Sequence, residues 1–306
     1  MEEFSFIKWI KNQQKRDKNV PIDIGDDCAS IKMNGKKLCL ITTDMLVEGT
    51  HFELKKTTPG QVGRKSLACS ISDIAAMGCS AKYAVVSICF HRETKTRFAK
   101  DLFLGMKKIA DEFNIKIIGG DIVSNKKLLV INVAMLGENN GLRPVTRSAS
   151  RVGDALMVTG TLGGSIVRKH LTFKPRLREG LMLNKKFKLH AMIDISDGLV
   201  ADLQHILAAS GTGAELYEDK IPVSPDAKQL ARKTGLSALD HALHDGEDYE
   251  LLFTLSQKES EKVLDSGFFS TRISKIGYVK KSMGIELQKS NGEIRRIKPI
   301  GYEHFK

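Results

Sequence analysis

The chain has 306 residues, 42% of them hydrophobic, with a formal net charge of +12 and five cysteines. It is long enough for a sizeable core and two domains, and no apolar run reaches the length of a bilayer span, so we expect a cytoplasmic protein without a membrane segment. The dispersed lysine pairs lack interleaved aromatic residues and the cysteines form no Cys-x-x-Cys pair, which argues against a nucleic-acid partner, a zinc site and a disulfide framework.

The first half of the chain predicts a mixed sheet covered by helices. A short amphipathic helix is expected over Phe4 to Ile10, and a strand over 37–44. A helix over 60–78 carries small residues that suit close packing, and Gly78 suits its C-terminal cap. The periodicity then predicts a strand over 82–90, a helix over 95–113, and strands over 115–121 and 128–137.

The second half resumes mixed α/β structure after a polar segment over 138–154 that has turn residues and no clear period. Strands are expected over 155–160, 191–196, 213–218, 249–255 and 272–279, with helices starting near Gly198, Ser224 and Ser256. We therefore predict two domains, an N-terminal α+β domain over 1–140 and a C-terminal mixed α/β domain over 141–306.

Acidic residues recur where an apolar strand ends or the next helix begins, beside Gly, Ser or Thr. They are Asp26, Asp27, Asp44, Asp73, Asp121, Asp194, Asp197, Glu247 and Asp248. For any one of them an N-cap or a turn is the simpler interpretation. Because open α/β folds bind ligands at strand ends, the repetition predicts that several carboxylates meet in one site.

Such a group of carboxylates predicts bound cations, since the charges would otherwise repel one another. Oxygen ligands without His or Cys favour Mg²⁺, which normally reaches the phosphates of a substrate. The glycine clusters IIGGD and TGTLGGS (Thr159 to Ser165) are expected to leave backbone N–H groups free for phosphate oxygens. No Walker-type P-loop and no kinase His-Arg-Asp loop is present.

A series of motifs runs in order along nearly the whole chain: IGDDCA, TTDMLVEGTHF, SISDIAAMG, IIGGD, VTRS, VGDALMVTGTLGGS, IDISDGLVADL, GEDYELLFT and GYEHF. Together they resemble the thiamine-monophosphate kinase family, whose superfamily also contains aminoimidazole ribonucleotide synthetase. The resemblance implies ATP-dependent phosphorylation of thiamine monophosphate to thiamine diphosphate, with several Mg²⁺ ions and ATP as co-substrate. It also implies a homodimer in which the N-terminal sheets of two subunits pair.

The resemblance implies roles for particular residues. The expected Mg²⁺ ligands are Asp27, Thr42, Thr43, Asp44, Asp73, Asp121, Asp194 and Asp197. The expected nucleotide contacts are Gly120, Asp121, Arg147 and Ser196, and the expected thiamine phosphate contacts are His51, Glu247 and Tyr302. We ascribe catalysis to Asp44, Asp121 and Arg147, by direct in-line transfer without a covalent intermediate. Asp26 is expected only to hold the turn or a hydrogen bond behind the metal.

From the residues alone, a structural position is as plausible as a ligand contact for three of these residues: His51 at a strand edge, Tyr302 in a core and Arg147 on a solvated surface. The segment after Ser165 is shorter than the family pattern.

Three residues also depart from the family pattern: Ser70 in place of Asn, Ile122 in place of Thr and Ala149 in place of Gly. They leave open a paralogue that acts on another small molecule. A non-catalytic nucleotide-binding dimer is a further alternative, which the complete carboxylate set disfavours. Selenophosphate synthetase would need a reactive cysteine near the N-terminus, and Cys28 instead follows GDD.

Overall fold

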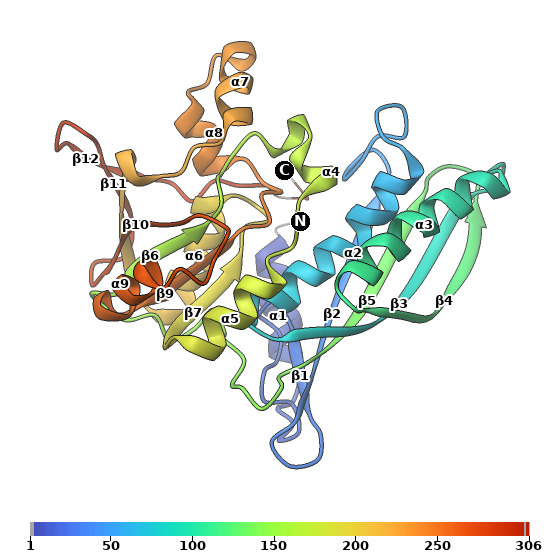
Figure 1. The fold of residues 1–306 in the computed structure, drawn as a ribbon, viewed down its shortest axis with the longest axis horizontal. Helices are drawn as coiled ribbons and strands as arrows, with labels where there is room; N and C mark the ends of the chain where they lie inside the picture. The colour runs from blue at the N-terminus through green and yellow to red at the C-terminus, as the bar shows by residue number, and fades with distance from the viewer. Residues whose placement is uncertain (1–2, 303, 306) are drawn as a thin grey trace.

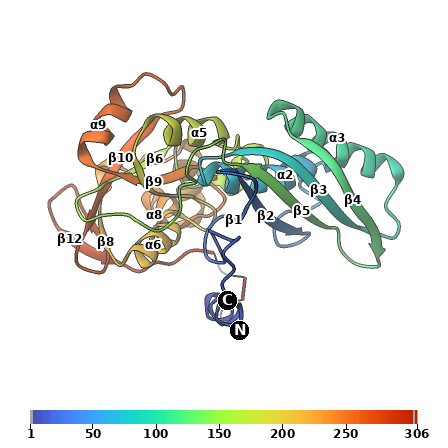
Figure 2. The same ribbon diagram turned by 90° about the horizontal axis from the view of Figure 1, so that it is seen from below.

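The computed structural model describes residues 3–302, 304 and 305, and it contains two β-sheets that lie on opposite sides of the molecule (Figure 1). The chain is of the mixed α and β class that the sequence predicts. Helix α1 (Glu3–Gln13) precedes the first sheet (Figures 1 and 2), and its Glu3 accepts a hydrogen bond from the His304 N–H at 3.4 Å. No helix in the described part of the chain is both long and apolar enough to span a bilayer.

The N-terminal sheet has the strand order β1-β2-β5-β3-β4. Its strands are β1 (Ala29–Lys32), β2 (Leu38–Val47), β3 (Ser80–His91), β4 (Lys116–Asn125) and β5 (Val130–Glu138). Neighbours pair antiparallel except β3 and β4, which are parallel. Helices α2 (Pro59–Ala76) and α3 (Thr96–Glu112) cover one face (Figure 2). The sequence predicts all of these elements except the short β1.

Helix α2 is the central element of the molecule and contacts strands and helices of both halves. It starts at Thr58, whose side chain forms a capping box with Gln61, and Pro59 occupies the first turn. A Cβ at Gly63 would lie 2.0 Å from the Leu102 carbonyl oxygen, so α3 can approach α2 only because this residue is glycine. This close packing buries almost the whole of α2, including its polar residues.

The C-terminal sheet has the order β12-β11-β8-β10-β6-β9-β7. Its strands are β6 (Ala155–Thr159), β7 (Leu189–Asp194), β8 (Gly213–Tyr217), β9 (Leu251–Leu255), β10 (Ile273–Lys280), β11 (Gly284–Gln288) and β12 (Ile294–Ile297). The helices of this half are α4 (Lys169–Thr172), α5 (Leu177–Lys186), α6 (Leu199–Ser210), α7 (Pro225–Thr234), α8 (Ala238–His244) and α9 (Gln257–Asp265). Short 3-10 turns lie at Ser165–Val167 and Glu218–Lys220.

The sequence did not predict α4, α5, α8, β11 or β12. β12 is four residues long and carries two arginines, so it has no apolar period to detect. Helix α5 contains Gly180, which weakens its helical pattern; a Cβ there would lie 2.2 Å from the Ala75 carbonyl oxygen. The glycine therefore lets α5 lie against α2.

Two apolar clusters form the core. The first combines residues of the N-terminal half, such as Leu67 and Ile131, with residues of the second half, such as Phe253 and Met192. The second lies around α6 and the C-terminal sheet, with Leu203 and Leu252. The boundary between residues 140 and 141 stays a prediction, but the shared first cluster holds the two sheets in a defined relation.

Candidate metal and substrate site

Three carboxylates from distant parts of the chain meet beside α2. The side-chain oxygens of Asp27, Asp73 and Asp194 can all lie within 4.8 Å of one another. Asp27 precedes β1, Asp73 lies in the last turns of α2, and Asp194 ends β7. The structure thus gathers three aspartates that the sequence selected, but the expected position at a strand end or helix start is wrong for Asp27 and Asp73.

Short polar side chains around the cluster orient its carboxylates. Ser72 Oγ donates to Asp194 Oδ2 at 2.6 Å, and Thr42 Oγ1 donates to Asp73 Oδ2. Asp44 lies near this group, since its charge acts on Asp73, and Ser70 Oγ donates to Asp44 Oδ2 at 2.6 Å. Alternation along β2 turns Thr42 and Asp44 toward α2.

Burial makes the ionised form of these carboxylates costly. Burial, followed by the charge of Asp27, raises the pKa of Asp194 to about 7. Burial, and then the charges of Asp44 and Asp194, hold the pKa of Asp73 well above its usual range. The second oxygen of Asp27, Oδ2, is buried and has no hydrogen-bond partner among the described residues. An unpartnered buried oxygen among crowded carboxylates fits a hard divalent cation such as Mg²⁺.

Arg147 is tied to the two adjacent aspartates. Its Nη2 donates to Asp27 Oδ1 at 2.7 Å, while its backbone N–H donates to Asp26 Oδ1 at 3.0 Å. Asp26 therefore makes a hydrogen bond beside Asp27, and its role behind a metal stays a prediction. Burial and the Asp27 charge raise the pKa of Asp26 to about 6. The solvated-surface interpretation of Arg147 is wrong, because its Nε is buried without a partner among the described residues.

Asp202, in the first turn of α6, binds the loop between β7 and α6. Asp202 accepts hydrogen bonds from the backbone N–H groups of Ser196, Asp197 and Gly198 at 3.0 to 3.1 Å. These bonds hold the turn that contains Asp197. One potential ligand atom from each of Asp197, Asp202 and His205 lies within 4.8 Å of the other two. Asp202 supports the loop from within the helix, a role that the sequence did not indicate.

A cavity of about 400 Å³ connects this region with the predicted substrate contacts. It is lined by His51, Glu247 and Tyr302, and by Asp44 at its carboxylate end. His51 comes from the loop after β2, and its Nδ1 accepts the Val47 N–H at 3.0 Å. The three predicted substrate contacts therefore share one cavity, and Tyr302 is half exposed rather than a core aromatic. Glu303 of the GYEHF motif lies outside the described residues.

Lys65 is a site residue that the sequence did not reveal. It lies in α2 with 0% of its side chain exposed, lines the cavity, and forms an ion pair with Glu247. Its Nζ also donates to the His51 carbonyl oxygen at 2.7 Å. One buried ammonium thus connects the segments that carry two predicted substrate contacts. Lys65 stands between Arg64 and Ser66 in a predicted helix, a position typical of a solvated lysine. Nothing in the sequence therefore marked it as a buried site residue.

Gly120, Asp121 and Thr43 do not join the cluster within one chain. Gly120 and Asp121 lie on β4, which is three strands away from β2, a separation of roughly 14 Å. Asp121 is exposed, and its Oδ1 accepts its neighbour's N–H, that of Ile122, at 2.9 Å. The Thr43 side chain points to the face opposite Asp44 and accepts from Asn132 Nδ2 at 3.0 Å.

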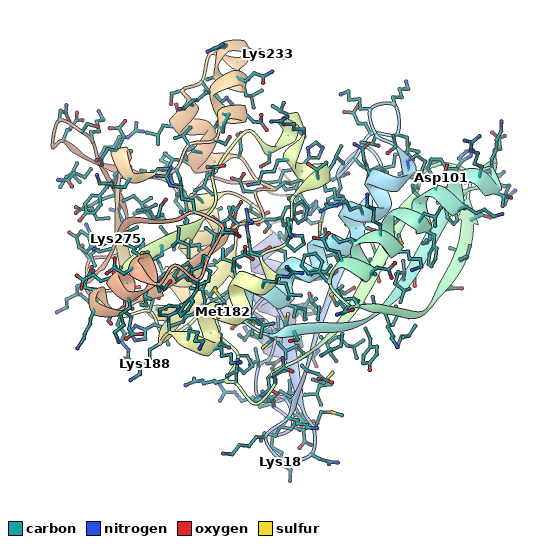
Figure 3. All side chains as sticks on the ribbon, in the orientation of Figure 1. Lys18, Asp101, Met182, Lys188, Lys233 and Lys275 are labelled. Atoms are coloured by element: carbon teal, nitrogen blue, oxygen red, sulfur yellow. The ribbon has the colours of Figure 1, made fainter. Side chains whose placement is uncertain are left out.

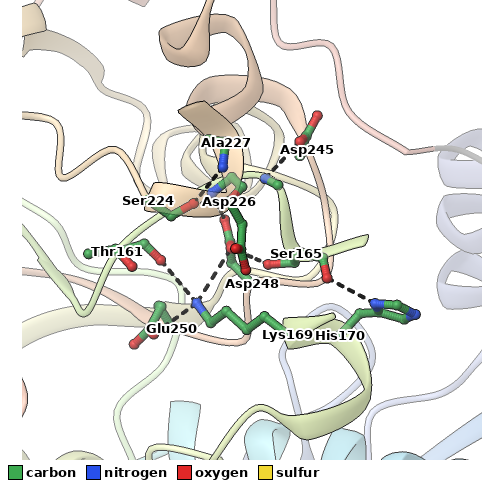
Figure 4. Close-up of polar contacts among 12 residues, drawn as sticks. Thr161, Ser165, Lys169, His170, Ser224, Asp226, Ala227, Asp245, Asp248 and Glu250 are labelled. Carbon is green, nitrogen blue, oxygen red and sulfur yellow. Dashed lines mark hydrogen bonds and ion pairs between the residues drawn. The ribbon is translucent and has the colours of Figure 1, made fainter. Parts of the chain in front are cut away.

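The prediction that the TGTLGGS loop leaves free N–H groups for phosphate is wrong. The Gly163 N–H donates to Asp248 at 2.7 Å, and the Gly164 N–H donates to Asp245 at 2.8 Å. Ser165 Oγ also donates to Asp248 (Figure 4). The loop's donors are therefore satisfied by protein carboxylates, and Asp248 is a buried structural residue rather than a metal ligand.

Cations on the segment after the loop complete this network. Lys169 Nζ donates to the Thr161 carbonyl oxygen at 2.9 Å and to Glu250 Oε1 at 3.0 Å (Figure 4). Arg176 adds two further bonds to Glu250, at 2.6 and 2.7 Å. These contacts fix the shortened segment after Ser165 against the sheet.

Comparisons with known proteins agree along the whole chain. Residues 25–139 match the family described as AIR synthase related protein, N-terminal domain, and residues 151–288 match its C-terminal domain. A thiamine-monophosphate kinase from Rhodopirellula baltica is 33% identical, over 99% of this chain and 97% of that protein. One from Bacillus subtilis is 31% identical and covers 100% of both chains. The chain belongs to the thiamine-monophosphate kinase family.

The solved structure described as AaThiL complexed with AMPPCP and TMP supports this assignment. It superposes with a TM-score of 0.86 at 30% identity and covers 99% of this chain and 97% of that one. A thiamine monophosphate kinase structure from Stenotrophomonas maltophilia has a TM-score of 0.75 at 28% identity, over 94% and 95% of the two chains.

The three departures from the thiamine-monophosphate kinase pattern have different consequences. Ser70 is buried and bonds to Asp44, so it takes part in the carboxylate cluster. Ile122 is 73% exposed on β4 and contributes nothing to the cavity. Ala149 has φ 96°, a conformation that glycine adopts freely and alanine does not. The Gly-to-Ala change therefore strains the backbone two residues after Arg147.

Proposed function

We propose that this protein transfers the γ-phosphoryl group of ATP to thiamine monophosphate and forms thiamine diphosphate. One observation carries the proposal: a single cavity joins Asp44 of the carboxylate cluster to His51, Glu247 and Tyr302. Membership of the thiamine-monophosphate kinase family supports it. So does the similarity to AaThiL, whose complex contains AMPPCP and TMP.

The cluster of Asp27, Asp44, Asp73 and Asp194 would hold Mg²⁺, and Asp197, which lines the same cavity as Asp44, would add a ligand from a neighbouring acidic group. Bound Mg²⁺ offsets the repulsion between the phosphates of the two substrates and the charge that develops on the transferring group. Ser70, Ser72 and Thr42 keep the carboxylates in position through the hydrogen bonds described above. We expect this cluster to bind several Mg²⁺ ions.

The acceptor needs little activation, because the phosphate of thiamine monophosphate is already an anionic nucleophile. Catalysis then depends on bringing two anions together in line. In the proposed arrangement Asp44 marks the end of the cavity where the phosphate lies, and His51, Glu247 and Tyr302 contact the rest of the substrate. Arg147, held by Asp27, and Ser196 would contact the nucleotide.

We propose that Gly120 and Asp121 act in the site of a second subunit. Within one chain β4 lies too far from β2, yet Asp121, Met45 and Asn132 stand in one row across the uncovered face of the sheet. Exposed apolar side chains, Met45, Tyr83 and Val123, lie on this face. Pairing of two such faces would bury these side chains and give the homodimer, in which we place β4 of one subunit near the site of the other.

A complementation experiment tests the shared site. Asp44→Asn and Asp121→Asn should each be inactive as pure proteins. After the two variants are mixed, unfolded and refolded together, half of the dimers carry one intact site, so activity should return to roughly a quarter of the wild-type value. No recovery from a preparation with confirmed mixed dimers would overturn the shared site.

Turnover itself is the main test. The purified protein with Mg²⁺, ATP and thiamine monophosphate should form thiamine diphosphate, and Asp44→Asn should abolish this. Asp101→Asn is the matched control, because Asp101 lies on the outer helix α3 (Figure 3) and does not line the cavity. If the wild type binds ATP but does not turn over thiamine monophosphate, the paralogue alternative replaces the proposal; binding without turnover of any small phosphate would favour the regulatory dimer.

A further inference from the structure

A second cavity of about 260 Å³ adjoins the substrate cavity. It lies between residues 49–57, which follow β2, and residues 166–171, which belong to the shortened segment after Ser165. Thr50, His51, Ile166 and Glu247 line both cavities. The two are therefore neighbouring chambers that meet at His51 and Glu247, two of the proposed substrate contacts.

The chemistry of the two chambers differs. The first reaches Asp44 and the carboxylate cluster, where phosphoryl transfer must take place. The second has apolar walls from Phe52, Val167 and Leu171, with charged residues from the 49–57 loop and the imidazole of His170. A substrate whose phosphate lies at Asp44 and whose carbon skeleton passes His51 and Glu247 would place its organic end in this second chamber.

His170 presents a hydrogen-bond acceptor to this chamber. Its Nδ1 lies 2.9 Å from the Ser165 carbonyl oxygen, and because a carbonyl can only accept, Nδ1 must carry the proton. Burial lowers the pKa of His170, so the ring is neutral near pH 7 and Nε2 bears a lone pair. The ring extends away from Lys169 and Asp248 (Figure 4), and only 8% of the residue is exposed.

We propose that the second chamber receives the heterocyclic end of the substrate and that His170 Nε2 accepts a hydrogen bond from the amino group of its pyrimidine ring. This inference rests on the proposed function, since it takes thiamine monophosphate as the substrate. The chamber is lined by apolar and by charged side chains. Within it, the neutral imidazole acceptor of His170 distinguishes an amino-substituted ring from its carbonyl analogue, because the analogue sets two acceptors against each other. His170 is thus a specificity-determining residue.

Two substitutions separate recognition from support of the fold. His170→Asn retains a donor at the position of Nδ1, and therefore the bond to Ser165, but removes the acceptor at Nε2. His170→Gln reverses this: it places an amide oxygen near Nε2 and loses the donor to Ser165. A purely structural role predicts that Asn is the better replacement, whereas recognition of the substrate predicts that Gln is.

The experiment compares kcat/KM for thiamine monophosphate with kcat/KM for oxythiamine monophosphate, which carries a carbonyl in place of the amino group. The wild type should prefer the amino substrate by at least about tenfold. This ratio should fall to about one in His170→Asn and stay within roughly threefold of wild type in His170→Gln, with KM for ATP unchanged in both.

Each other outcome overturns the inference. A ratio unchanged in His170→Asn would leave the proposed function intact and assign His170 to the fold alone. A raised KM for ATP with an unchanged ratio would assign the chamber to the adenine ring. If the wild type shows no turnover with either compound, the proposed function fails, and the inference fails with it.

Discussion

Replacement of Lys65 by Met removes the buried cation that connects the cavity walls and keeps a similar side-chain length. The ion pair with Glu247 and the 2.7 Å bond to the His51 carbonyl oxygen are lost together. Since Lys65 is completely buried, the wild-type protein can keep its charge only through these partners. The variant leaves a carboxylate and a carbonyl without their donor.

The expected cost follows from the burial of each partner. Breaking a buried ion pair costs about 3–5 kcal/mol when the remaining charge is fully enclosed. The Glu247 side chain is 25% exposed, so water recovers part of that loss. The methionine also gains apolar burial. We expect a net decrease of roughly 2–3 kcal/mol in the free energy of unfolding.

Urea unfolding of the metal-free protein, followed by circular dichroism, measures this change. Lys56→Met is the matched control, because Lys56 forms an exposed ion pair with Glu53, and it should cost less than about 0.5 kcal/mol. In Lys65→Met/Glu247→Gln, removal of the second charge should restore about 1 kcal/mol. If Lys65→Met costs no more than Lys56→Met, the buried ion pair does not stabilise the cavity as argued.

The remaining predictions concern the cluster and its junction. Ala149→Gly should relieve the strain at φ 96° and stabilise the protein by roughly 0.5–1 kcal/mol, seen as a higher midpoint in urea; a lower midpoint would contradict this. Asp26→Asn keeps the acceptor for the Arg147 N–H but removes a carboxyl whose pKa is raised to about 6. Because the folded wild type holds this proton up to about pH 6 while the unfolded chain loses it near pH 3.8, wild-type stability falls through that window. The variant should therefore match the wild type near pH 4 and exceed it above pH 6, and a pH-independent difference in Tm would refute this. Mg²⁺ alone should raise the Tm of wild-type protein treated with EDTA, and the shift should be much smaller in Asp73→Asn; equal shifts in both would place the cation elsewhere.

Local patterns in the sequence were sufficient for the long elements and for part of the site. Successive side chains of a strand point to opposite faces, so Thr42 and Asp44, two positions apart on β2, could be expected on one face. Asp194 ends β7, which is where ligands gather in open α/β folds, whereas Asp73 lies inside α2 and Asp27 precedes β1. Elements without a period were missed: α5 is interrupted by Gly180, and β12 is short and basic.

Other parts of the site depend on contacts between residues that are far apart in the sequence. Lys65 meets Glu247 across 182 positions, and Gly163 meets Asp248 across 85. Two adjacent carboxylates thus have different roles: Glu247 lines the cavity, and Asp248 binds the glycine loop. The local sequence could not distinguish them. Asp121 and Thr43 show the converse, since both match the motif pattern but point away from the cluster of their own chain.

The sequence by itself determined the class of fold and the family, and it predicted oxygen ligands for a metal, because hydrophobic period and residue chemistry are local properties. Tertiary structure decided which carboxylates lie close together and which ones accept hydrogen bonds from the glycine loop. It also decided where the buried Lys65 and His170 line the two cavities. The physical reason is that burial and partner distance set the charge and the hydrogen bonds of each group, and both arise only when the two sheets pack against α2.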